Sequence, residues 1–265
     1  MSDFKIVSPV DGSVYATCHY ADPARIRAAA ETGRKAFAQW RQVPFAERAR
    51  MVRSFLSVLD KHRERLAELV TWQMGRPSWQ ADEMDRMLQS ADVLIGDAAG
   101  ILQPPQEKPD DNITRSVQRI PMGLCLSICA WNYPVAMSAS LILAPLLMGN
   151  VVLFKHAPQT ALIAEVFGIA AAESDLPDGV LQTLHMTHPD TEALIGSGLV
   201  DLVEFIGSTR AGMRYTMRAG APSPATAWNW AARIPSISGR TSSLTQSSRT
   251  CWKAATAMPA SPAVR

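Results

Sequence analysis

The sequence predicts an α/β fold in which a helical layer and a β-hairpin precede a doubly wound, mostly parallel sheet. Three observations lead to this prediction. Residues 22–100 carry apolar side chains at a spacing close to 3.6, the period of an amphipathic helix. From residue 122 onward, short apolar runs typical of buried parallel strands alternate with helical segments. These runs begin about every 25 to 30 residues, the span of a βαβ unit, so we expect consecutive strands to be parallel.

The helical layer is expected to contain three helices. Residues 22–40 begin with an Asp-Pro pair, which supplies a side-chain cap and a proline at the first helical position. A second helix is expected over residues 45–74, because Gly-Arg-Pro at 75–77 ends its apolar stripe. A third is expected over residues 78–100.

The strands are expected to begin with a hairpin. Residues 113–119 alternate like an exposed strand and residues 122–129 like a buried one, with Pro121 between them. The segments that follow are expected to be helices at 134–147, 160–173, 190–195 and from 208, and strands at 151–155, 180–184 and 202–206.

Composition excludes several classes of protein. The 265 residues are 47% hydrophobic, enough for a real core, and a net charge of +2 does not indicate nucleic-acid binding. Residues 120–154 lack charged side chains, but glycine, asparagine and proline interrupt them, which favours a strand, a buried helix and a strand over a membrane span. The four cysteines form no CxxC pair, and the N-terminus has no secretory signal, so we expect a cytoplasmic protein without a metal site or disulfides.

Ligands of doubly wound sheets bind at the carboxyl ends of the strands, so the residues directly after each strand are candidates. In Trp131-Asn132-Tyr133-Pro134, the Asn132 amide could donate to a developing oxyanion, or Asn132 could simply cap a helix. Lys155 ends the next strand and could meet ribose hydroxyls or a phosphate, or it could be an ordinary solvated lysine.

Two later segments also leave alternatives open. Gly207 and Ser208 begin a turn whose amides and hydroxyls could hold a pyrophosphate, although helix capping by Ser208 explains the turn almost as well. His185 and His188 lie three apart, and a metal site would need at least one more donor. Cys125 and Cys129 are expected to be inert core thiols.

Six segments of the chain carry a family resemblance. The first two are SPVDGSV and FAQWRQVPFAERARMV, and four further blocks follow: RIPMGLCLSICAWNYP, LAPLLMGNVVLFKHAPQT, LPDGVLQTLH and VEFIGSTRAG. Together, across residues 8–220, they resemble the aldehyde dehydrogenase superfamily. SPVDGSV is similar to that family's opening "NPATGEV", the second segment is similar to its "F..W...P...R", and the four blocks stand in family order and at family spacing.

The resemblance implies a Rossmann-like nucleotide-binding domain that uses NAD or NADP to oxidise an aldehyde to a carboxylic acid. Asn132 matches the family's oxyanion-hole asparagine, and Trp131 matches a residue beside the cofactor. Lys155 matches the lysine that contacts the adenosine ribose, and Gly207 and Ser208 match residues at the pyrophosphate.

Two departures affect the cofactor. Ile206 replaces the threonine of "F-T-G-S", and Lys155-His156-Ala157-Pro158 replaces the family's "K-P-S-E" or "K-P-A-E". The lost carboxylate removes an acceptor for the ribose 2′-hydroxyl and would repel a 2′-phosphate less, so the choice between NAD and NADP stays open.

The family's catalytic glutamate and cysteine come from "E-L-G-G-K" and "G-Q-x-C" segments, and neither occurs here. All 24 acidic residues lie before residue 221. Codons for residues 228–235 can be chosen that, read one nucleotide earlier, encode Leu-Glu-Leu-Gly-Gly-Lys-Asp-Pro, and a shifted reading of residues 251–265 can encode Gly-Gln-Ser-Cys. This favours a reading-frame change near Gly220.

We therefore expect residues 1–220 to form an incomplete nucleotide-binding domain and residues 221–265 a poorly ordered tail. The chain is expected to lack dehydrogenase turnover and to expose a sheet edge. The alternative is a non-catalytic, cofactor-binding remnant, or one that associates with full-length subunits through residues 113–129 or forms a homo-oligomer. A short-chain dehydrogenase is a weaker option, because no Tyr-x-x-x-Lys pair is present.

Overall fold

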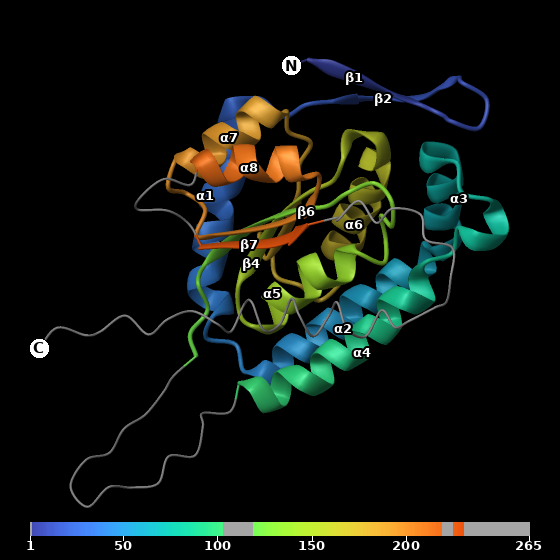
Figure 1. Cartoon of the computed structure of the whole chain (residues 1–265). Helices are drawn as coiled ribbons and strands as arrows, with labels where there is room; N and C mark the ends of the chain where they lie inside the picture. Colours follow the sequence, from blue (N-terminus) through green and yellow to red (C-terminus); the bar gives the residue numbers. More distant parts are fainter. Residues whose placement is uncertain (1, 103–118, 219–224, 231–265) are drawn as a thin grey trace, which may run out of the picture.

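The computed structural model describes residues 2–102, 119–218 and 225–230, and its centre is a five-stranded parallel sheet (Figure 1). The strand order is β5-β4-β3-β6-β7, and every neighbouring pair is parallel. Because β3 lies in the middle and the chain builds outward on one side before crossing to the other, the sheet is doubly wound, as predicted.

The helices are α1 (Pro23–Trp40), α2 (Phe45–Lys61), α3 (Arg63–Met74), α4 (Met84–Ile101), α5 (Ala144–Leu147), α6 (Ala161–Glu173), α7 (His188–Gly196) and α8 (Thr209–Arg218). The strands are β1 (Asp3–Val7), β2 (Val14–His19), β3 (Leu124–Ile128), β4 (Val151–Lys155), β5 (Leu181–Thr183), β6 (Leu202–Gly207) and β7 (Ala225–Trp230).

Helices cover both faces of the sheet. Gly33 of α1 packs so tightly on Leu124 of β3 that a Cβ there would lie 2.9 Å from the leucine Cδ1 atom. Phe167 of α6 packs on Phe154 of β4, with ring centroids 5.8 Å apart. Leu124 pairs with Val151 in the register, and Phe154 lies three residues further along β4. The contacts of α1 and α6 are therefore on opposite faces, because successive side chains of a strand alternate.

The N-terminal helices differ from the expected segments at two points. The single helix predicted over residues 45–74 is two helices, because the chain leaves helical geometry at His62. The helix predicted from residue 78 begins with a 3₁₀ turn, Ser78–Gln80, and α4 starts only at Met84. Asp82 accounts for the later start, since its Oδ1 atom accepts the Met84 amide at 2.9 Å.

The helix predicted over residues 134–147 is also shorter and less regular. Residues 134–137 form turns, and Ala139–Leu143 is a π-helical turn that leads into α5. Pro145 has no N–H to offer the carbonyl of Leu141, four residues earlier. The Ser127 Oγ atom of β3 donates to that carbonyl at 2.6 Å, so the strand stabilises the irregular turn.

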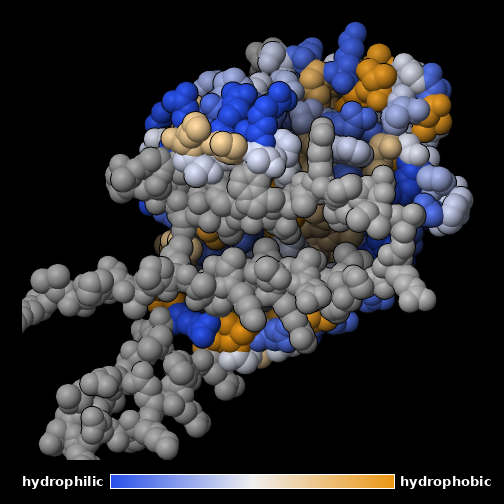
Figure 2. All heavy atoms as spheres, in the orientation of Figure 1, coloured by the Kyte–Doolittle hydropathy of each residue, from blue (hydrophilic) through white to orange (hydrophobic). Residues whose placement is uncertain are grey.

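The hairpin lies at the N-terminus, where β1 and β2 pair antiparallel. The strand predicted over residues 113–119 lies almost wholly outside the described residues, and β3 pairs with β4 and β6. Ile6 and Cys18 are buried against Ala161 of α6, whereas Figure 2 shows hydrophobic residues exposed at the far end of the hairpin. One end of the hairpin is therefore anchored to the body.

Strand β7 lies inside the segment that we expected to be poorly ordered. Its backbone pairs in parallel with β6 from Leu202↔Ala225 to Gly207↔Trp230. Within this segment, the described residues Ala225–Trp230 thus form a strand at the end of the sheet, next to β6. None of the helices in the described ranges is long and apolar enough to cross a membrane.

Candidate functional site

The carboxyl ends of β4, β3 and β6 lie side by side, because these are neighbouring parallel strands. The chain leaves β3 toward β4 and later crosses back to β6, so the winding direction reverses between β3 and β6. Doubly wound sheets bind ligands at this switch point. It lies between the turn at residues 130–134, which follows β3, and the turn at residues 207–208, which ends β6.

The turn after β3 presents Trp131 and Asn132. Trp131 is 53% exposed, and Asn132 is half-buried. Among the described residues, no hydrogen bond is made by the Asn132 side-chain amide, while its backbone carbonyl accepts from Arg76 Nη2 at 2.6 Å. The amide is therefore available to an incoming oxygen, and the alternative that it caps a helix is wrong.

The buried carboxylate of Glu83 performs the capping instead. Its Oε2 atom accepts from the amides of Val135 at 2.9 Å and Ala136 at 2.8 Å, and Arg76 donates to its Oε1 atom. Burial raises the pKa of Glu83, and these amide bonds and Arg76 oppose the shift. Arg76, through its bonds to Glu83 and to the Asn132 carbonyl, thus joins the start of α4 to the turn.

Sequence analysis missed Arg76 and Glu83. The available signal was a charged residue immediately before the apolar positions Met84 and Met87 of the third predicted helix. The amides that Glu83 accepts, those of Val135 and Ala136, lie 52 and 53 residues away in the chain, beyond the reach of a periodicity argument. Arg76 also stacks on Tyr133, with its guanidinium carbon 4.3 Å from the ring centroid, which fixes the middle of the turn.

Lys155 at the end of β4 is buried, with 3% of its surface exposed. The alternative of a solvated lysine is therefore wrong. Burial lowers the pKa of its amine to about 8. Among the described residues, its Nζ atom makes one long hydrogen bond, 3.4 Å to the carbonyl of His156. A buried amine with so few described partners favours a ligand rich in hydroxyl or phosphate oxygens.

His156 ties the end of β4 to the turn after β3. Its Nδ1 atom accepts from the Ala157 amide at 3.0 Å, so the proton is on Nε2, which lies 3.1 Å from the Pro134 carbonyl and donates to it. Burial lowers the pKa of His156 to about 4, which keeps the ring neutral. The histidine that replaces the family's proline is therefore a fixed structural link.

Gly207 and Ser208 complete the site at the end of β6. A Cβ on Gly207 would lie 2.4 Å from the Cζ atom of Phe205, so any side chain here would have to displace the Phe205 ring. The Ser208 Oγ atom accepts from the Ala211 amide at 3.3 Å, and its carbonyl accepts from Gly212, so Ser208 caps α8. The capping alternative is thus correct for this side chain, and the helix N-terminus beside it remains suited to an anion.

The two histidines of the possible metal site point in different directions, and the two core cysteines stay buried. His188 contacts the Tyr215 hydroxyl through Nδ1 at 2.7 Å, whereas His185 points away toward α6. Cys125 and Cys129 are buried, and burial raises the pKa of Cys129 to about 12. Both thiols are therefore core groups, as expected.

These residues fit a nicotinamide dinucleotide. A carboxamide without a described partner and a helix N-terminus beside a glycine flank the switch point of the doubly wound sheet, and a buried amine ends the adjacent strand β4. Nicotinamide dinucleotides bind at such switch points. The departures from the family pattern, at Ile206 and within residues 156–158, leave these three features intact.

Comparison with known proteins gives one consistent result. The sequence model of the "Aldehyde dehydrogenase family" matches residues 1–228. An N-succinylglutamate 5-semialdehyde dehydrogenase from Erwinia tasmaniensis is 32% identical over 216 residues, which are 81% of this chain and 43% of that protein. A succinate-semialdehyde dehydrogenase [NADP(+)] from Deinococcus radiodurans is 29% identical over 220 residues, 82% of this chain and 46% of that protein.

A solved structure agrees with these relatives. The crystal structure of an NAD-dependent benzaldehyde dehydrogenase from Corynebacterium glutamicum superposes with a TM-score of 0.79 at 25% identity, covering 86% of this chain and 50% of the other. The chain spans less than half the length of the two dehydrogenases from Erwinia tasmaniensis and Deinococcus radiodurans.

Proposed function

Because the chain belongs to the aldehyde dehydrogenase family, we propose that it binds NAD or NADP at the carboxyl ends of β4, β3 and β6. The observation that carries this proposal is the gathering of Asn132, Lys155 and the Gly207–Ser208 turn at the ends of three adjacent parallel strands.

Each residue has a role that its surroundings support. The buried Lys155 amine would donate to the adenosine ribose hydroxyls in place of its long hydrogen bond to the His156 carbonyl. Gly207 would let the dinucleotide backbone approach the chain closely, and the N-terminus of α8, capped by Ser208, would stabilise the pyrophosphate charge. The exposed ring of Trp131 would lie beside the cofactor.

The proposed reaction of the complete family enzyme is oxidation of an aldehyde to a carboxylic acid. The bound dinucleotide supplies the hydride acceptor. Asn132 donates its free side-chain amide to the oxygen that becomes negatively charged, and Arg76 and Glu83 hold the backbone of its turn in place.

For this chain itself we propose cofactor binding without turnover. A thiolate nucleophile and a carboxylate base are needed for the family's chemistry, and the segments that carry them do not occur in the sequence. Of the described thiols, Cys18, Cys125 and Cys129 are buried, and burial raises the pKa of each. A reading-frame change near Gly220 accounts for the missing segments, and the coding DNA around codon 220 tests it directly.

Titration of the purified chain with NAD and NADP, followed by tryptophan fluorescence, tests binding. We expect saturable binding that Lys155→Met weakens by at least about tenfold, the effect of losing about 1.4 kcal/mol of interaction. Lys35→Met, which removes an exposed lysine of α1, is the control and should bind as the wild type does. Absence of binding to both nucleotides would overturn the proposal.

Two further measurements separate the alternatives. Aldehyde-dependent reduction of NAD or NADP, lost in Cys251→Ser, would show that the chain is a working enzyme and refute the proposed inactivity. Co-purification with a full-length homologue, without nucleotide binding, would instead support a remnant that associates with complete subunits.

A further inference from the structure

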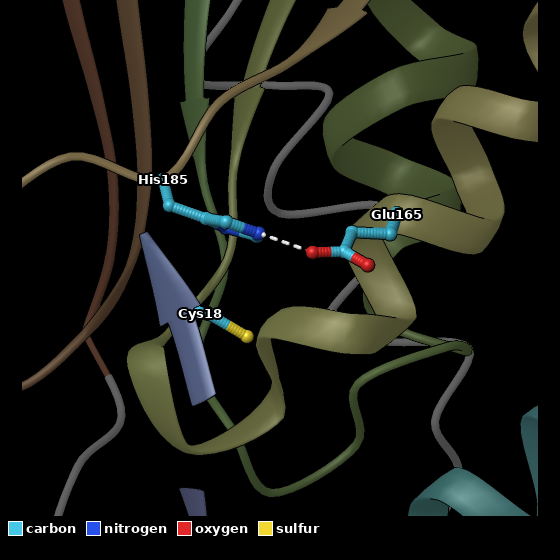
Figure 3. Close-up of side chains that lie close together, drawn as sticks. All are labelled: Cys18, Glu165 and His185. Carbon is cyan, nitrogen blue, oxygen red and sulfur yellow. Dashed lines mark hydrogen bonds and ion pairs between the residues drawn. The ribbon is translucent and has the colours of Figure 1, made fainter. Parts of the chain in front are cut away.

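A cysteine, a glutamate and a histidine from three separate elements meet beside β5 (Figure 3). Cys18 lies in β2, Glu165 in α6, and His185 in the loop after β5. One ligand atom from each residue, a sulfur, a carboxylate oxygen and a ring nitrogen, can be chosen so that all three lie within 4.8 Å of one another. None of the three residues takes part in the cofactor binding proposed above.

The surrounding contacts hold these side chains together. The Ala21 amide donates to the His185 carbonyl at 2.9 Å, which fastens the end of the hairpin to the loop after β5. His185 Nε2 lies 3.0 Å from the Glu165 Oε1 atom, and the edge of the imidazole packs against the Phe4 ring. The three donors are thus positioned by backbone and packing before any ligand arrives.

The donor set and its spacing match zinc. Zn²⁺ binds thiolate, imidazole and carboxylate at about 2.3, 2.0 and 2.0–2.2 Å, which puts tetrahedral ligand atoms roughly 3.2–3.8 Å apart. The His185–Glu165 separation of 3.0 Å is already close to that range, and the 4.8 Å limit on the other separations leaves a closure of at most roughly 1 Å. The Glu165 side chain is half-exposed, so it can rotate toward an entering ion.

Access and surroundings also suit an ion. The Glu165 side chain is 50% exposed and lines, with Leu184, a hollow of about 630 Å³ along β5, whereas Cys18 is 5% exposed and packs among apolar side chains. Solvent therefore reaches the cluster from the carboxylate side, where a water could serve as the fourth ligand, and the sulfur side is dry.

The arrangement also suits a cation electrostatically. The Cys18 sulfur and a Glu165 carboxylate oxygen lie within 4.8 Å of each other. A divalent cation between them would stabilise the negative charge of the carboxylate and that of the sulfur once its proton has left.

We propose that Cys18, Glu165 and His185 bind one Zn²⁺, with water as the fourth ligand, and that this ion fastens the β1–β2 hairpin to the body of the domain. On binding, the Cys18 S–H bond breaks, its proton passes to solvent, and the sulfur donates its electron pair to zinc, whose oxidation state does not change.

The experiment uses the full chain, stripped of metal, in a Cys251→Ser background so that a thiol outside the described residues does not compete. Zn²⁺ affinity is measured by competition with a chromogenic chelator, and Co²⁺ replaces zinc for absorption spectra. We expect one bound ion per chain, a thiolate-to-Co²⁺ charge-transfer band, and a rise in Tm with Zn²⁺.

Single ligand changes should each weaken Zn²⁺ binding by at least about tenfold, since even outer partners of metal ligands contribute this much. Cys18→Ser should also abolish the charge-transfer band. Glu165→Gln changes a half-exposed side chain and so gives an answer even if Cys18→Ser does not fold. Two control variants should leave the Zn²⁺ affinity unaltered. His188→Gln changes a histidine that contacts the Tyr215 hydroxyl, and Glu173→Gln changes an exposed glutamate of α6, the helix that also carries Glu165.

Three results would overturn the proposal. These are a Co²⁺ complex without the thiolate band, a Zn²⁺ affinity that Glu165→Gln leaves unchanged, and an affinity that His188→Gln lowers as much as His185→Gln does.

Discussion

Two arginine–glutamate pairs in the N-terminal helical layer differ in their surroundings. Arg76 and Glu83, at the turn after β3, have side chains only 11% and 1% exposed, whereas Arg65 and Glu68, on the surface of α3, are 48% and 49% exposed. The buried pair also binds three backbone groups of the turn, while Glu68 bonds, among the residues that the structure describes, to Arg65 alone. The same two types of side chain therefore fix the backbone of a turn where they are buried, but form only a surface ion pair where they are exposed.

The largest expected effect follows from removing the buried carboxylate. Glu83→Ala leaves Arg76 and the amides of Val135 and Ala136 without their partner, so we expect the free energy of unfolding to fall by about 3–5 kcal/mol. Urea unfolding followed by circular dichroism measures the change. A variant without any cooperative transition would also agree.

Glu83→Gln is the matched variant. It keeps an oxygen that can accept the amides and loses only the charge, so its effect should be clearly smaller than that of Glu83→Ala. A loss below about 1 kcal/mol in Glu83→Ala would contradict the view that this carboxylate holds the turn.

Lys155 adds a third case to the comparison of buried and exposed charges, because it is buried and has no acidic partner in the described residues. Its pKa is lowered from 10.5 to about 8, so between these pH values the unfolded chain binds the proton and the folded chain does not. The free energy of unfolding therefore rises with pH across this window, by about 3 kcal/mol from this group.

Lys155→Met should accordingly be more stable than the wild type near pH 7, and its advantage should shrink between about pH 8 and pH 10.5. The difference between the two proteins is the quantity to measure, because the buried thiols, whose pKa values are raised, destabilise the folded chain above pH 9. A constant difference across the window would show that Lys155 stays charged when buried.

The next largest effect is expected from His156→Asn, which removes the hydrogen bond to the Pro134 carbonyl. This change should lower the free energy of unfolding by about 1–2 kcal/mol at pH 7. Its pKa is lowered from 6.5 to about 4, so acidification through this range protonates the unfolded chain first and destabilises the wild type. The cost of His156→Asn should thus shrink as pH falls from 6.5 toward 4, as thermal unfolding would show. His19→Asn, at an exposed histidine, is the control, and a pH-independent cost would contradict the prediction.

The central sheet could be predicted from the sequence, and the reason is local. The runs at β3 and β4 are apolar except for Ser127 because both faces of each strand are buried, and Lys155 marks the end of one run. The family resemblance identified Trp131, Asn132, Lys155 and the Gly207–Ser208 turn, which lie at the ends of adjacent strands in the structure.

What could not be predicted depends on contacts between distant segments. A lysine at the end of a strand can be buried or solvated, so the burial of Lys155 does not follow from its position in the sequence. The Glu83 carboxylate meets amides 52 and 53 residues away. The Cys18, Glu165 and His185 donors come from a hairpin, a helix and a loop, so no spacing along the chain brings them together. The break between α2 and α3 at His62 could not be predicted, because the apolar stripe continues on both sides of it.

The smallest effect belongs to the exposed pair. Arg65 donates to the Glu68 Oε2 atom at 2.6 Å across one helical turn. In water, side-chain ordering offsets most of the attraction, so Glu68→Gln should lower the free energy of unfolding by only about 0.3–0.5 kcal/mol at low salt. The same measurement in about 1 M salt should show no difference from the wild type, because the Debye length there is about 3 Å. Glu68→Gln and Glu83→Gln are the same chemical change at an exposed and a buried position. Equal losses of stability in the two variants would mean that burial and backbone bonding add nothing to the pair beside the turn.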